Sequence, residues 1–178
     1  AGRADVDLQL FDPATERIDA ATRRRAAAEI EEAARSVPGA DRILSVSASV
    51  GDTSFERAFV ASNGFEGTRR GTDHGVACEV SAADPDGRRP EDWDAATARY
   101  LADLPAPARI GRGAAERALS RIGAVKGDSA VAPVVVDARA AGRLREILGP
   151  YDTPRGFRRR ARALLDERGP VQVIEQYS

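Results

Sequence analysis

The sequence predicts an α/β (α+β) domain in which an antiparallel β-meander packs with several amphipathic helices. Apolar and serine residues alternate strictly over residues 44–50, which is the two-residue period of a strand with one buried face. Asn63-Gly64 is a tight-turn signal, because both residues tolerate positive φ. Residues 108–122 place Ala115, Leu119 and Ile122 on one helical face. A meander followed by a packing helix accounts for all three signals.

The first half of the chain is predicted to form an extended lead-in, a helix and the start of the meander. Residues 5–13 are expected to be extended up to the Asp12-Pro13 turn, and a helix is expected over residues 16–36. After the strand at 44–50, Gly51-Asp52 is expected to turn the chain into a second strand at residues 53–62. These elements supply the first strands of the predicted sheet.

The second half alternates between strands and helices. A last meander strand is expected at about 74–83, with Val76, Cys78 and Val80 on one face, and Asp84-Pro85-Asp86-Gly87 is expected to be a turn. The remaining elements are a helix at 91–103, the helix at 108–122, a strand at 131–136, a helix at 138–148, an arginine-rich helix at 155–168 and an edge strand at 171–174. The change of character after Gly149-Pro150 divides the chain into a domain at 1–148 and a C-terminal helix and strand at 149–178.

The amino-acid composition indicates which classes of protein the chain can belong to. The chain has 178 residues, is 42% hydrophobic and carries a net charge of −1, which suits a globular protein and does not favour a strongly basic nucleic-acid binder. A single cysteine cannot form an internal disulfide, and no apolar run is long enough to span a bilayer, so a cytoplasmic location is expected. The sequence contains no methionine, so we expect a processed or trimmed chain or a piece of a longer protein.

No catalytic, cofactor-binding or metal-ligating residue is predicted. His74 is the single histidine, and a zinc site needs three or four ligands, so we expect a solvated histidine at a strand end. Neighbouring residues on a strand face opposite ways, so Asp73 would not share a ligand sphere with it. Cys78 alternates with valines and is expected to be a core residue.

Three further patterns have structural interpretations. Gly111-Arg112-Gly113 opens the helix at 108–122 but fails the dinucleotide fingerprint, so packing glycines are expected. The arginine runs at 23–25 and 158–160 should spread around their helices as solvated faces. Four aspartates are expected to belong to a turn and a helix cap, because EF-hand spacing is absent. These are Asp84, Asp86, Asp92 and Asp94.

Several segments, taken in order, resemble the TldD/PmbA family of peptidase-like proteins, and most closely its PmbA branch, also called TldE. The resemblance covers about residues 5–148. The segments that carry it are Leu10-Phe11-Asp12-Pro13, Ala40-Asp41-Arg42-Ile43, Ser62-Asn63-Gly64-Phe65-Glu66-Gly67, Asp103-Leu104-Pro105, Ile110-Gly111, Ala114 through Arg121 and Ala132 through Asp137.

The resemblance implies a fold like the family's N-terminal region and a place in a two-subunit peptidase system. In that system a TldD-type subunit holds the metal in an H-E-x-x-x-H helix and a TldE-type subunit is its non-catalytic partner. The expected role is therefore to scaffold or hold unfolded peptides for a metal-bearing partner, with no cofactor and no independent catalysis by this chain. Expected partners are a TldD-like subunit or a second copy, together with unfolded peptide, and neither nucleic acid nor a membrane.

The sequence is also compatible with two other hypotheses for the function. The first is a stand-alone binding or oligomerisation module without a proteolytic role. The second is an anion- or DNA-binding domain that uses the arginine runs, whose affinity would fall steeply with added salt.

Overall fold

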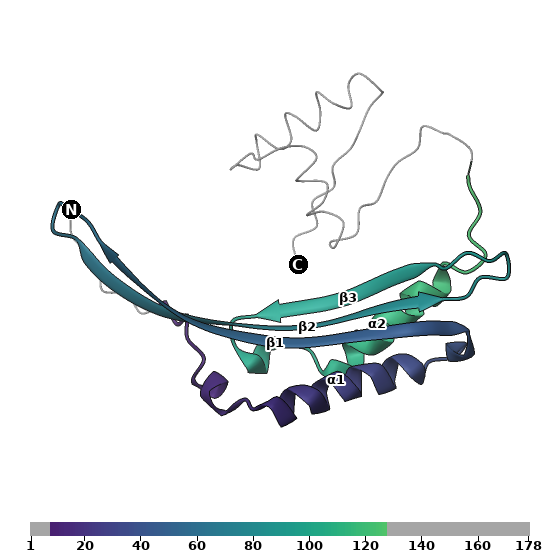
Figure 1. The fold of residues 1–178 in the computed structure, drawn as a ribbon, viewed down its shortest axis with the longest axis horizontal. Coiled ribbons are helices and arrows are strands. Elements are labelled where there is room, and N and C mark those ends of the chain that lie inside the picture. The colour runs from purple at the N-terminus through teal and green to yellow at the C-terminus, as the bar shows by residue number, and fades with distance from the viewer. Residues whose placement is uncertain (1–7, 128–178) are drawn as a thin grey trace, which may run out of the picture. The chain divides into compact units, whose positions relative to one another are not determined.

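The computed structural model describes residues 8–127, and these form an α+β unit built on a three-stranded antiparallel sheet. The strands β1 (Ile43–Val60), β2 (Glu66–Ala82) and β3 (Glu91–Ala98) follow one another in the order β1-β2-β3. Helices α1 (Ala20–Arg35) and α2 (Pro107–Ser120) both lie on one side of the sheet (Figure 1). The predicted fold class and the antiparallel meander are confirmed.

One short 3-10 helix precedes α1 and two others connect the elements. They are η1 (Pro13–Arg17), η2 (Ala40–Arg42) and η3 (Leu101–Asp103). Helix α1 begins at an Asp19 cap, whose carboxylate accepts the Thr22 N–H at 2.7 Å. Helix α2 begins with Pro107 at its first position, where a missing N–H costs nothing. The helix predicted at 16–36 is thus a 3-10 turn followed by α1, and the helix predicted at 108–122 is α2.

The core lies between the two helices and β2. It combines Ile30 and Ala34 of α1 with alternate β2 residues and an alanine-rich face of α2. Small residues let α1 and α2 approach closely. A Cβ built on Gly111 would lie 2.0 Å from the Ile30 carbonyl oxygen, so this position requires glycine. Gly111-Arg112-Gly113 therefore lies inside α2 rather than opening it, and Gly111 is a packing glycine as expected.

Two predicted boundaries on the meander are wrong. Gly51 and Asp52 do not turn the chain, because they pair in register with Gly75 and His74 and β1 runs through them. Strand β2 begins at Glu66, eight residues before the predicted start at 74. The Asn63-Gly64 turn is confirmed, with Gly64 at φ 82° and its N–H donating to the Ala61 carbonyl at 3.0 Å.

The predicted helix at 91–103 is also wrong. Residues 91–98 form β3, which pairs with β2 from Ser81 to His74, and η3 follows. Asp92 and Asp94 point to the helix-covered side, where they are buried, while Trp93 is half exposed on the opposite side. The turn at Asp84–Gly87 before it is confirmed by the Gly87 N–H, which donates to the Asp84 carbonyl at 2.9 Å.

The β1–β2 hairpin extends well past β3. Strand β3 pairs with β2 only as far as His74, so residues 53–60 and 66–73 form a two-stranded ribbon that no third strand of the described chain accompanies. Figure 1 shows this ribbon continuing beyond the end of β3. We call these two segments the arm. The expected elements at 131–136, 138–148, 155–168 and 171–174 lie outside the described residues.

Candidate functional site

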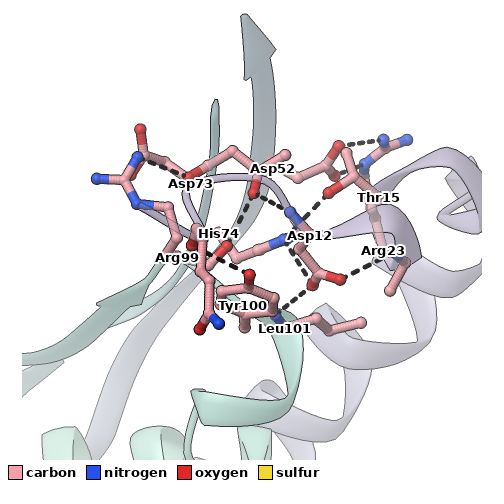
Figure 2. Close-up of polar contacts among 12 residues, drawn as sticks. Asp12, Thr15, Arg23, Asp52, Asp73, His74, Arg99, Tyr100 and Leu101 are labelled. Atoms are coloured by element: carbon pink, nitrogen blue, oxygen red, sulfur yellow. Dashed lines mark hydrogen bonds and ion pairs between the residues drawn. The ribbon is translucent and has the colours of Figure 1, made fainter. Parts of the chain in front are cut away.

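Where the arm joins the sheet, a buried histidine meets a buried carboxylate. The His74 side chain on β2 is 2% exposed, and its Nε2 lies 3.3 Å from Oδ2 of Asp12 and 3.2 Å from Oγ1 of Thr15 (Figure 2). The expectation of a solvated His74 is therefore wrong. The reason is that Asp12 and Thr15 come from the segment before α1 and cover the middle of β2, where the arm joins the sheet. Asp73 is exposed and faces the other way, as predicted.

Main-chain donors fix the Asp12 carboxylate. The Leu101 N–H donates to Oδ2 at 2.7 Å and the Ala14 N–H donates to Oδ1 at 2.9 Å. The pKa of Asp12 is lowered chiefly by the Leu101 hydrogen bond, against an opposing effect of burial, with further help from Ala14 and His74. Asp12 is therefore an ionised acceptor at neutral pH.

The main chain of Asp12 belongs to a wider set of hydrogen bonds that ties the N-terminal segment to the sheet. The Asp12 N–H donates to Thr72 Oγ1 at 2.9 Å, and this hydroxyl donates to the Arg99 carbonyl at 2.9 Å. Arg99 Nη1 donates to the Thr72 carbonyl at 3.1 Å, and the Tyr100 hydroxyl donates to the Gln9 carbonyl at 3.0 Å. We call residues 9–15, with Thr72, His74 and 99–101, the N-terminal clamp.

A bidentate ion pair stands next to the clamp. Arg23 of α1 donates from Nε to Asp52 Oδ1 at 2.5 Å and from Nη2 to Oδ2 at 2.9 Å (Figure 2). The Arg23 hydrogen bond is the main reason that the pKa of Asp52 is lowered. Arg23 thus faces the sheet while Arg24 and Arg25 are exposed, so the run spreads around the helix as predicted. The run at 158–160 lies outside the described residues.

A pocket of about 170 Å³ lies between α1, the middle of the sheet and residues 101–107. Its polar lining comes from Thr22, Arg23, Asp52 and His74. Its apolar lining comes mainly from Ile18, Ala26, Val50, Val76, Leu104 and Pro105. The pocket is small for a ligand site, since sites for drug-sized molecules occupy roughly 300–1,000 Å³.

The geometry of this cluster does not activate a nucleophile. In a Ser-His-Asp arrangement the acid binds one ring nitrogen and the hydroxyl binds the other. Here Asp12 and Thr15 both approach Nε2 of His74. Thr15 is therefore not placed for proton transfer to a histidine oriented by Asp12.

The cluster does not fit a metal either. Within residues 8–127 no group of three or more His, Cys, Asp or Glu side chains could hold a metal ion. Both oxygens of Asp52 accept from Arg23, and both oxygens of Asp12 accept main-chain N–H groups. The hydrogen bonds of the cluster hold chain segments in place.

The remaining sequence candidates are structural. Cys78 is 1% exposed in the core, as predicted, and burial is the main cause that raises the pKa of its thiol to about 11. Asp92 and Asp94 do not cap a helix. From β3, Asp92 pairs with Arg121, the residue that caps the C-terminus of α2, and Asp94 pairs with Arg117 inside α2, each at 2.9 Å. These pairs fasten the edge strand to α2.

The sequence did not identify Asp12 and Thr15 as partners of His74. One signal was present, because His74 is in phase with Val76, Cys78 and Val80 and so falls on the face predicted to be buried. A histidine on that face needs polar partners from other elements. Spacing alone could not identify partners 59 and 62 positions away.

The part of the chain that the structure describes contains no helix long and apolar enough to cross a membrane.

Sheet order, helix placement and the long hairpin define the class of this unit: an α+β domain with both helices on one face of a three-stranded meander. The chain belongs to the PmbA/TldA metallopeptidase family, because the model of that family's central domain matches residues 13–122. The predicted resemblance to TldD/PmbA proteins is confirmed, and the matched segment is the central domain rather than the N-terminal region expected from the sequence.

Two solved structures show the same fold. A proposed modulator of DNA gyrase from Bacteroides thetaiotaomicron is 27% identical, with a TM-score of 0.65 over 71% of this chain and 28% of its own. A second, from Thermotoga maritima, is 20% identical, with a TM-score of 0.64 over 72% of this chain and 29% of its own, and supports the fold alone. The chain thus spans less than a third of either relative. A search of curated proteins found no match.

Proposed function

We propose that this chain is a non-catalytic, TldE/PmbA-like part of a TldD/TldE-type metallopeptidase system. Its role is to hold unfolded peptides, or to scaffold the assembly that holds them, for a metal-bearing partner. The observation that carries the proposal is the long open edge of β1 in a chain of this family. We place this role in the cytoplasm, because that compartment is reducing and would keep the thiol of Cys78 free.

The outer edge of β1 is suited to bind an extended chain. The strand has 18 residues, which is about 60 Å at roughly 3.3 Å per residue. Within residues 8–127 its only strand partner is β2. An open edge pairs through main-chain groups, so it accepts extended peptides largely without regard to their sequence. That property suits a protein that handles unfolded substrates.

Binding to an unfolded substrate tests the proposal directly. We expect the full chain to bind fluorescein-labelled casein, measured by fluorescence anisotropy, and not folded serum albumin. We also expect no cleavage of casein by the chain alone after incubation with zinc and dialysis. One zinc ion retained per molecule together with casein cleavage would overturn the proposal.

Proline substitution locates the binding edge. On an edge strand, neighbouring residues direct their N–H groups alternately toward the partner strand and away from it. Of Ser47→Pro and Ala48→Pro, one should therefore unfold the sheet and the other should leave it folded. We expect the folded variant to lose casein binding, with Ser47→Ala as the matched control. Binding that survives in the folded proline variant would show that β1 is not the site.

A further inference from the structure

The arm places two arginines directly opposite each other. In the β1–β2 register Arg57 pairs with Arg69, and directly opposite side chains in an antiparallel pair have Cβ atoms about 5 Å apart. Like charges at this spacing destabilise a sheet. Neither guanidinium forms an ion pair within the described residues, and Arg57 lies over the Phe55 ring at 4.8 Å.

The other face of the arm is arranged differently. Arg70 is 3.4 Å from Glu16 and its guanidinium lies 3.9 Å above the Phe11 ring. Arg70 alternates with Arg69, so it projects from the opposite face. Glu16 of η1 therefore offsets the charge of Arg70, while Arg57 and Arg69 stay together on the face away from the helices.

Aromatic side chains flank this pair. Phe55, Arg57 and Phe59 are two residues apart along β1 and so share one face. Phe59 is 63% exposed and meets Phe65 edge-to-face at 5.8 Å between ring centroids. An exposed aromatic ring beside two arginines offers both apolar contact and a bidentate oxyanion partner.

We infer that the Arg57–Arg69 pair binds the carboxylate of an acidic residue in an extended peptide, while Phe59 packs on a neighbouring apolar side chain. The inference rests on the proposed function and names a preferred substrate class for it: unfolded segments in which an acidic residue adjoins an apolar one. A carboxylate between the two guanidinium groups would offset their repulsion.

The charge of the arm favours a peptide over nucleic acid. The arm carries three arginines (Arg57, Arg69 and Arg70) and three acidic residues (Glu56, Glu66 and Asp73). Nucleic acid carries a charge on every phosphate, and its affinity grows with the number of phosphates neutralised. A neutral arm with one arginine pair suits a single carboxylate.

The experiment compares two short fluorescein-labelled peptides that differ only by aspartate or asparagine beside a leucine. We expect Arg57→Gln/Arg69→Gln to bind the aspartate peptide about three- to ten-fold more weakly than the unchanged chain, as for two exposed ion pairs. The asparagine peptide should bind both proteins alike, and high salt should abolish the preference. The matched control is Arg24→Gln/Arg112→Gln, which removes the same charge from exposed helix positions.

The outcomes separate this inference from the proposed function. An aspartate preference that survives in Arg57→Gln/Arg69→Gln, or is equally lost in the control, overturns the inference. Tighter binding of oligothymidylate than of the aspartate peptide overturns it in favour of nucleic acid. If both peptides bind without an aspartate preference, peptide holding stands and the inference fails. If neither peptide nor casein binds, both fail.

Discussion

The contact between α1 and α2 makes Gly111→Ala a sharp test of the fold. A Cβ at this position would lie 2.0 Å from the Ile30 carbonyl oxygen and 3.2 Å from the Ala34 nitrogen. Ordinary contacts begin near 3.4 Å, so the nearer contact falls short by 1.4 Å, and both obstacles are main-chain atoms of α1. The helices must therefore separate, which opens the core around Ile110 and Ala114.

Two effects oppose each other in this variant. Overpacking a core costs up to about 3 kcal/mol, and the clash with main chain places this site at the upper end. Alanine in place of glycine within a helix recovers about 1 kcal/mol. We therefore expect a net loss of about 2 kcal/mol in the free energy of unfolding, or a Tm lower by roughly 8 °C for a unit of this size.

Urea titration followed by circular dichroism measures the change, with Arg112→Ala as the control. Arg112 is exposed on the same helix, so its replacement should change the free energy of unfolding by less than about 0.5 kcal/mol. If Gly111→Ala equals or exceeds the unchanged chain in stability, the helix propensity has dominated. The close crossing of α1 and α2 would then be incorrect.

Two further predictions concern the clamp and the core. The lowered pKa values of Asp12 and Asp52 mean that the stability they contribute is present above the ordinary value of 3.8 and is lost as pH falls through the lower folded values. Asp12→Asn should lower the free energy of unfolding, measured by urea titration, by about 1–2 kcal/mol at pH 7. This loss should shrink below about pH 4. A loss that stays constant with pH would contradict the ionised state of Asp12. The Cys78 thiol, with its pKa raised to about 11, should react with a disulfide reagent at pH 8 only after urea unfolds the chain, and rapid labelling of the folded chain would show that it is accessible.

Local signals were sufficient where neighbouring residues decide the structure. Asn63-Gly64 marks a turn because Gly64 adopts positive φ, and α2 follows from its apolar face. Gly51-Asp52 carries a similar turn signal but lies within β1. There, pairing with Gly75 and His74 and the Arg23 ion pair of Asp52 outweigh the local preference.

Strand β3 was missed because its two most buried side chains are carboxylates. Asp92 and Asp94 face the helices and Trp93 faces outward, so the usual alternation of apolar and polar residues is inverted. Periodicity cannot show that Arg117 and Arg121, more than 20 residues later, neutralise these carboxylates. His74 was misjudged for the same reason, since its partners come from the N-terminal segment.

The buried side of β2 explains why the side chains of the arm stay exposed. From Val80 to Val76 this side is apolar and covered by the helices, while Thr72 and His74 are buried through polar bonds to the N-terminal clamp. Beyond Thr72 the arm is a two-stranded ribbon with exposed side chains, and such ribbons are marginally stable alone in water. The clamp thus anchors the base of the arm without supplying a core for its tip. A partner that covers Phe59 and the arginine pair would add the burial that the fold itself does not provide.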